Sequence, residues 1–121
     1  MKLIDTDKAP KAIGHYSQAV KANGFLFLSG QIAIGAETTD IKTQTQTVLK
    51  NIHGILQSEG LDWSALVKVT VFLKEFEKFS EFNSVYAEIL GSHKPARSAV
   101  EVSRLPKNVA LEIEAIAVLP E

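Results

Sequence analysis

The stretch Leu111–Leu119, with the sequence LEIEAIAVL, decides the fold class because its side chains alternate with a period of two. One face of the predicted strand is wholly apolar and consists of Leu111, Ile113, Ala115, Ala117 and Leu119. The opposite face mixes the carboxylates of Glu112 and Glu114 with the aliphatic Ile116 and Val118. Neither bulk solvent nor a closed core suits such a mixture. We therefore expect this second face to form a subunit interface that also holds a polar pocket.

Other segments on the N-terminal side have the pattern of a strand. Phe25–Ser29 follows an Asn-Gly turn and is predicted to pair with Ala19–Ala22 in a hairpin. Leu66–Leu73 (LVKVTVFL) alternates along its length, and Ser98–Ser103 alternates around two valines. Leu3-Ile4 is a candidate for an additional edge strand. The expected inward face of LVKVTVFL is Val67, Val69, Val71 and Leu73.

Two segments have the period of a helix. From Ile41 to Gly60 the apolar residues form one stripe, and Gly60 is a typical helix stop. A second stripe runs from Phe76 to Leu90 and is closed by Gly91. The resulting order is β-β-α-β-α-β-β. It predicts an α+β fold, a mixed β-sheet with two helices packed on one face.

Length and composition fit a single domain, residues 1–121. An apolar content of 45% argues against disorder, and the absence of cysteine excludes disulfides, a thiolate nucleophile and cysteine-based metal sites. A net charge of −1 gives no strong positive field for nucleic acid or an anionic membrane. The N-terminal stretch MKLIDTDKAP lacks the apolar core of a signal peptide. We expect a soluble, cytoplasmic protein.

Arg97 is a candidate anchor for a substrate carboxylate. It follows Pro95-Ala96 at the start of a strand whose other residues are typical of a sheet interior. Its guanidinium is a permanently charged fork that matches a carboxylate. The alternative is a structural arginine paired with an acidic residue. Glu112 and Glu114 are candidates to orient a water or carry a proton, or else belong to a solvated strand face. Periodicity does not choose between these two carboxylates.

Weaker candidates lie elsewhere. Tyr16 either lines a pocket or caps the edge of the core, and Asn83 is either a pocket donor or a solvated helix residue. Ser29 and Gly30 end a strand, where Gly30 either admits a ligand to the backbone or marks a plain turn. The three histidines show no metal-binding spacing, and no nucleotide-binding or serine-hydrolase motif occurs.

Four stretches together resemble the RidA (reactive intermediate deaminase, YjgF-type) family. They are Ala9–Val20 (APKAIGHYSQAV), Ser29–Ile32 (SGQI), Leu66–Leu73 and, above all, Pro95–Val118 (PARSAVEVSRLPKNVALEIEAIAV). The resemblance extends over nearly the whole chain, and the last stretch is its specific part.

The resemblance implies a chorismate-mutase-like α+β fold assembled as a homotrimer, with three clefts between adjacent subunits. It implies a 2-iminobutanoate/2-iminopropanoate deaminase that hydrolyses reactive imines and enamines, such as 2-aminoacrylate, to 2-keto acids and ammonia. Neither metal nor cofactor is implied. Arg97 matches the arginine that grips the substrate carboxylate, and Glu112 the glutamate that orients the attacking water. Substrate-binding positions in the cleft are matched by Tyr16, Ser29, Gly30, Asn83 and, through its backbone, Ala99.

Three positions depart from the family pattern. His15 stands where a proline is usual, Ala99 where many members have cysteine, and Gly35–Asp40 is shorter than the usual turn. Two other functions stay open. One is a non-catalytic regulatory trimer that binds a small carboxylic acid, as in relatives linked to regulation or inhibition of translation. The other is RNA binding or cleavage, which the net charge of −1 disfavours.

Overall fold

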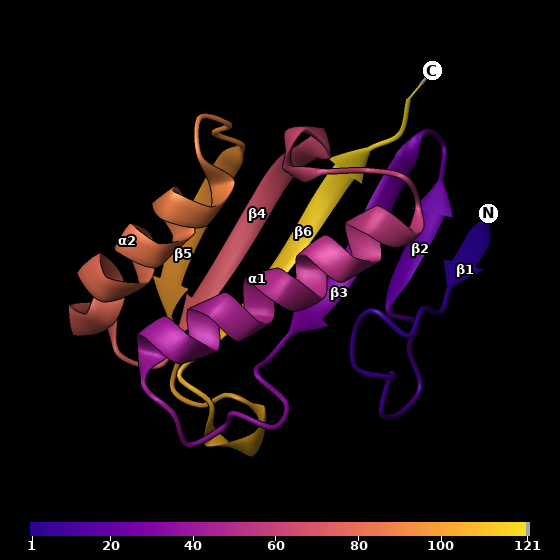
Figure 1. Cartoon of the computed structure of the whole chain (residues 1–121). Helices are drawn as coiled ribbons and strands as arrows, with labels where there is room; N and C mark the ends of the chain where they lie inside the picture. Colours follow the sequence, from indigo (N-terminus) through magenta and orange to yellow (C-terminus); the bar gives the residue numbers. More distant parts are fainter. Residues whose placement is uncertain (121) are drawn as a thin grey trace.

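One six-stranded sheet carries the fold, and two helices lie across one of its faces (Figure 1). The computed structural model describes residues 1–120. The strands are β1 (Lys2–Ile4), β2 (Ala19–Ala22), β3 (Phe25–Gln31), β4 (Leu66–Leu73), β5 (Ala96–Glu101) and β6 (Leu111–Val118). The helices are α1 (Ile41–Ser58) and α2 (Phe79–Leu90), with short 3₁₀ turns at Trp63–Ala65, Phe76–Lys78 and Pro106–Asn108. The predicted α+β fold with two helices on one face of a mixed sheet is therefore confirmed.

The last strand lies inside the sheet. The order is β1-β2-β3-β6-β4-β5, so β6 pairs antiparallel with both β3 and β4, while β4 and β5 run parallel. The alternation predicted for β6 is confirmed, since Leu111 and Ile113 are fully buried whereas Glu114 and Val118 are exposed. The apolar face of β6 is covered by the helices and forms the core.

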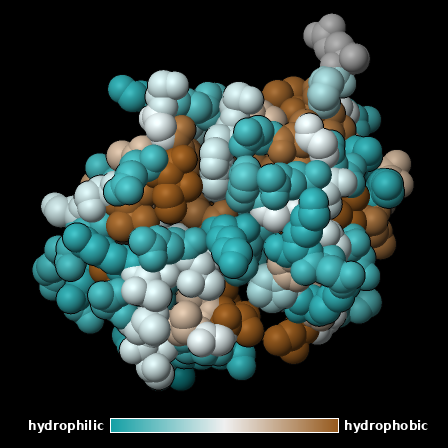
Figure 2. Space-filling model, viewed as in Figure 1, coloured by the Kyte–Doolittle hydropathy of each residue, from teal (hydrophilic) through white to brown (hydrophobic). Residues whose placement is uncertain are grey.

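The helices begin and end where the sequence provides caps. The Asp40 carboxylate accepts a hydrogen bond from the Thr43 backbone N–H at 2.9 Å and starts α1. Gly91 follows α2 with a φ of +67°, a conformation that glycine adopts without strain. Phe82 of α2 is fully buried against the sheet. In the view of Figure 2 the helix layer presents mostly hydrophilic side chains, interrupted by apolar patches.

The opposite face of the sheet has no layer over it. Phe27, Val100 and Val118 on this face are 43–44% exposed. Among them lies Lys68, whose ammonium donates to the Ser98 hydroxyl at 2.9 Å. The apolar and charged mixture expected from the even-numbered residues of the last strand is therefore present.

Three details of the strand predictions were wrong. Val67 does not face the core, because the β4–β6 register shifts between Leu66 and Lys68 and Leu66 is buried instead. The strand predicted at Ser98–Ser103 spans Ala96–Glu101, so Arg97 lies within it. This strand, β5, is also an edge strand and not an interior one.

No helix within residues 1–120 is long and apolar enough to cross a membrane. The cytoplasmic location expected from composition stays a prediction.

Candidate functional site

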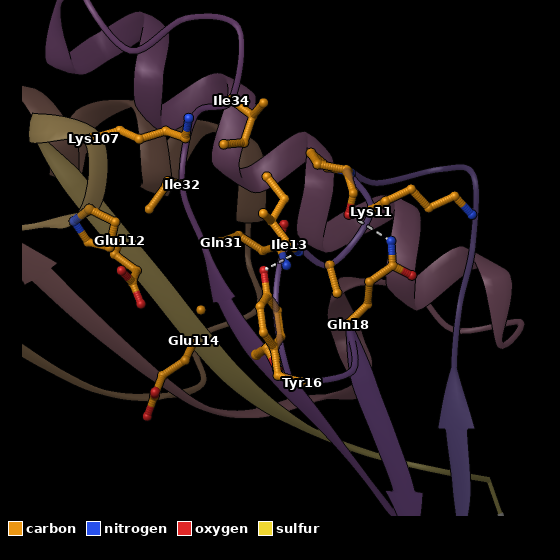
Figure 3. Close-up of a pocket in the computed structure, with 15 residues that line it drawn as sticks. Lys11, Ile13, Tyr16, Gln18, Gln31, Ile32, Ile34, Lys107, Glu112 and Glu114 are labelled. Atoms are coloured by element: carbon orange, nitrogen blue, oxygen red, sulfur yellow. Dashed lines mark hydrogen bonds between the residues drawn. The ribbon is translucent and has the colours of Figure 1, made fainter.

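The predicted site residues fall into two groups on the single chain. The first group surrounds a cavity of about 580 Å³ beside the end of β3 (Figure 3). The N-terminal loop, the segment after β3 and the 3₁₀ turn before β6 close this cavity. Its lining includes Tyr16, Ser29, Gly30, Lys107, Glu112 and Glu114.

Glu112 lies directly against Gly30. The register of β3 against β6 shifts between Leu28 and Gln31, which brings Gly30 over the glutamate side chain. A Cβ atom on residue 30 would collide with Oε2 of Glu112 and lie 2.8 Å from its Cδ. The backbone of Gly30 is not in the left-handed region, so this contact, and not conformational freedom, requires glycine here.

The carboxyl group of Glu112 has an elevated pKa. Burial is the larger cause and the neighbouring charge of Glu114 is the smaller one. Glu112 is half-buried, whereas Glu114 is exposed. Periodicity did not choose between the two carboxylates. Glu112 is the one whose surroundings raise its pKa, which is the direction expected for a group that exchanges a proton with a substrate.

Two hydroxyl groups in this cavity already have backbone partners. The Tyr16 hydroxyl accepts a hydrogen bond from the Ile13 N–H at 3.2 Å (Figure 3), and the Ser29 hydroxyl donates to the Ser17 carbonyl at 2.6 Å. Both bonds hold the loop that carries Tyr16. Tyr16 therefore faces the cavity with its ring, and Ser29 with its backbone at the end of the strand.

The second group surrounds a cavity of about 390 Å³ between α2 and the start of β5. Arg97 and Asn83 both line it. The Arg97 guanidinium donates through Nη1 to the Asn83 carbonyl oxygen at 2.9 Å. Its Cζ lies over the rings of Tyr86, Phe79 and Phe82, at 4.9, 5.3 and 5.9 Å from their centroids. We call these three rings the aromatic cage.

Arg97 has no ion-pair partner among residues 1–120. The structural alternative, an arginine paired with an acidic residue, is therefore not realised within the described chain. Neutral groups hold the guanidinium instead: an amide oxygen and the faces of the aromatic cage. Its positive charge stays uncompensated in a cavity, which is the electrostatic condition for binding an anion.

Arg97 and Glu112 lie on opposite faces of the sheet. Arg97 is in register with Val69, which is buried under the helices. Glu112 is in register with Phe72, three residues further along β4 than Val69; because side chains alternate along a strand, this odd offset places Glu112 on the helix-free side. A ligand of a few heavy atoms cannot contact both side chains of one chain.

The remaining predicted positions follow this division. Ala99 shares the helix-facing side of β5 with Arg97 and packs against the core. The histidines do not gather: His53 contacts Asp62, His93 contacts the Leu66 carbonyl, and the described residues contain no group of metal-binding side chains.

Sequence reasoning missed several residues of these cavities. Lys107 lines the larger cavity from a left-handed backbone position with a φ of +56°. Gln18 is buried and ties the N-terminal loop together, accepting from the Thr6 N–H at 2.7 Å and donating to the Pro10 carbonyl at 2.8 Å. The aromatic cage was visible only as an apolar helix stripe. Its aromatic composition at three- and four-residue spacing was the one available signal.

Comparison with known proteins places the chain in a family. Residues 6–119 match the family model described as Endoribonuclease L-PSP. The chain belongs to this family, also known as YjgF/RutC/Rid. A RutC family protein, PH0854 of Pyrococcus horikoshii, is 54% identical over 121 residues, which cover 96% of each chain.

Two further similarities concern the fold and a named activity. A solved structure of a putative endoribonuclease, TM0215 of Thermotoga maritima, has a TM-score of 0.91 at 47% identity and matches 100% of this chain and 99% of its own. Reactive Intermediate Deaminase A, chloroplastic, of Arabidopsis thaliana is 42% identical over 123 residues, which are 98% of this chain and 66% of that protein.

Proposed function

We propose that this protein hydrolyses 2-imino acids and their enamine tautomers, such as 2-aminoacrylate, to 2-keto acids and ammonia. The observation that carries the proposal is the unpaired Arg97 guanidinium in a cavity, combined with a second cavity that holds the half-buried Glu112. A 2-imino acid has the two matching features: a carboxylate to anchor and an electrophilic carbon to hydrate. The name of the Arabidopsis thaliana relative supports this reaction class.

The reaction needs two contributions from the protein: a bound substrate carboxylate and a correctly placed water. Arg97 binds the substrate carboxylate and fixes the position of the imine carbon, which is already electrophilic. Glu112 accepts a hydrogen bond from a water on the open side of that carbon and takes its proton as the C–O bond forms. Glu112 passes that proton to the nitrogen, which gives the tetrahedral intermediate its amino group. The C–N bond then breaks as the hydroxyl proton of the intermediate moves to the nitrogen through Glu112 or water, so that ammonia leaves and the C=O bond of the keto acid forms. General acid–base help of this kind contributes about 10²–10⁴-fold in rate.

We further propose that the working site lies between two copies of the chain, in a homotrimer. The support is the placement of Arg97 and Glu112 on opposite faces of one sheet. One copy supplies the cavity lined by Arg97 and Asn83, and the next supplies Glu112 with Tyr16, Ser29 and Gly30. The exposed apolar side chains on the uncovered sheet face provide surface that such an assembly would bury.

The direct test is keto-acid release from a freshly made imine. A pyridoxal-phosphate-dependent dehydratase acting on serine or threonine generates the imine, and semicarbazide competes for it as a trap. We expect the wild-type protein to divert the imine to free keto acid, and Arg97→Ala to have lost this effect while remaining folded. Full turnover by Arg97→Ala would show that Arg97 does not anchor the substrate.

A regulatory protein that binds a small carboxylic acid without turnover is the second candidate. The Arg97 cavity favours it in one respect, because an uncompensated guanidinium binds a carboxylate without any help from Glu112. The two candidates differ in their need for the glutamate. A deaminase loses its effect in Glu112→Ala and in Arg97→Ala alike, whereas a binding protein loses it only in Arg97→Ala.

A further inference from the structure

The hydroxyl of Tyr86 is the only buried side-chain polar atom within residues 1–120 that has no hydrogen-bond partner. Tyr86 belongs to α2 and is buried, with 7% of the residue exposed. Buried polar groups are nearly always paired, because an unpaired one keeps its full desolvation cost. An uncompensated cost at one position, where the other buried side-chain polar atoms of residues 1–120 are paired, indicates a function that stability alone does not explain.

The unpaired oxygen belongs to the ring that lies closest to Arg97. The guanidinium Cζ is 4.9 Å from the Tyr86 centroid, nearer than to either phenylalanine of the aromatic cage. An arginine carries five N–H donors, and in the described chain Asn83 is the one acceptor in hydrogen-bond geometry with them. The guanidinium is nevertheless close enough to the Tyr86 hydroxyl to offset part of the rise in its pKa that burial causes. Unused donors and an unused acceptor therefore lie next to each other at the edge of the same cavity.

We propose that Tyr86 is a positioning residue for Arg97: when a carboxylate binds the guanidinium, an Arg97 N–H donates to the Tyr86 hydroxyl oxygen. The inference rests on the carboxylate-anchoring role of Arg97 in the proposed function. A bidentate carboxylate uses two N–H groups and Asn83 accepts from a third, so that Tyr86 accepts from a fourth. These bonds fix the plane of the guanidinium, and the rings of the aromatic cage pack against it.

The substitution Tyr86→Phe tests the proposed role of the hydroxyl, because it removes only the hydroxyl oxygen. The ring and its contact with Arg97 remain, and only the oxygen is lost. We expect two effects of opposite sign: the affinity for 2-oxobutanoate falls about tenfold, and the melting temperature stays equal or rises because an unpaired buried hydroxyl is gone. In turnover, KM rises while kcat is largely kept. Calorimetric titration and thermal unfolding of the full chain, in the assembly it forms, give both values.

Two further variants separate the explanations. Ser84→Ala also removes a hydroxyl from α2, but one that is exposed and bonded to the Glu81 carbonyl, so its affinity for 2-oxobutanoate should equal that of the wild type. In an Arg97→Lys background the loss caused by Tyr86→Phe should disappear, because the compact ammonium lacks the guanidinium fork.

The failures are distinguishable. If Arg97→Ala leaves 2-oxobutanoate binding unchanged, the proposed function loses its anchor. If Arg97→Lys weakens binding and Tyr86→Phe does not, the proposed function stands and the role of Tyr86 is refuted. An equal loss from Tyr86→Phe in both backgrounds also refutes it, since the hydroxyl would then act independently of Arg97.

Discussion

At the residue scale, Gly30 and Glu112 form one unit, because the glycine leaves the space that the carboxylate occupies. We predict that Gly30→Ala removes most of the imine-hydrolysing activity while changing the melting temperature little. The added methyl group meets the flexible end of the Glu112 side chain, which rotates away at low cost but leaves the position in which we propose that it orients the water. The check is the semicarbazide assay combined with thermal unfolding. In a Glu112→Gln background, Gly30→Ala should cause no comparable further loss, and a full additional loss would mean that Gly30 acts through its backbone alone.

The raised pKa of Glu112 also predicts how stability depends on pH. Its folded-state pKa lies above the ordinary value of 4.5, because the buried group resists ionisation. The unfolded chain therefore gives up this proton first, and the contribution of Glu112 to stability is lost as the pH rises from about its ordinary pKa through the raised one. Glu112→Gln should consequently gain stability relative to wild type at pH 7 and gain less at pH 4. Urea unfolding at the two pH values measures the difference, and a larger gain at pH 4 would contradict the assigned direction.

At the scale of elements, helix α1 is held against the N-terminal loop through Gly54. A Cβ atom at this position would collide with the backbone carbonyl oxygen of Lys8 and lie 2.9 Å from its carbonyl carbon. Gly→Ala inside a helix usually stabilises by about 0.5–1 kcal/mol. We predict the opposite sign for Gly54→Ala, since backbone must move to admit the methyl group. Denaturant unfolding tests this, with the exposed Gln46→Ala on the same helix as a control that should not destabilise.

The elements themselves could largely be predicted from the sequence, and the site only in part. Periodicity identified the strand that begins at Leu111, because one of its faces is fully buried and the alternation can be seen within that single segment. The bulge that exposes Val67 and the edge position of Arg97 depend on which strands become neighbours, which alternation within one segment does not reveal. Which strands become neighbours also determines that Arg97 and Glu112 lie on different faces of the sheet. Resemblance to a family selected both residues, but only the register places them on opposite faces.

At the scale of the whole molecule, the account predicts an assembly. The apolar side chains on the uncovered sheet face and the division of the site between two cavities both call for a second copy. Light scattering coupled to size exclusion should give the mass of a trimer of the 13.2 kDa chain. A stable monomer that still hydrolyses the imine would remove the shared site.

The most direct test of the central claim mixes two inactive variants. Arg97→Ala and Glu112→Ala, unfolded together and refolded at equal concentrations, form mixed assemblies in which some clefts combine Glu112 of one copy with Arg97 of another. With random mixing of neighbours the account predicts recovery of about a quarter of the wild-type rate of keto-acid release. Each variant refolded alone should stay inactive. If the mixture is as inactive as its components although mixed assemblies have formed, Arg97 and Glu112 do not act together across a subunit boundary, and the proposed site is wrong.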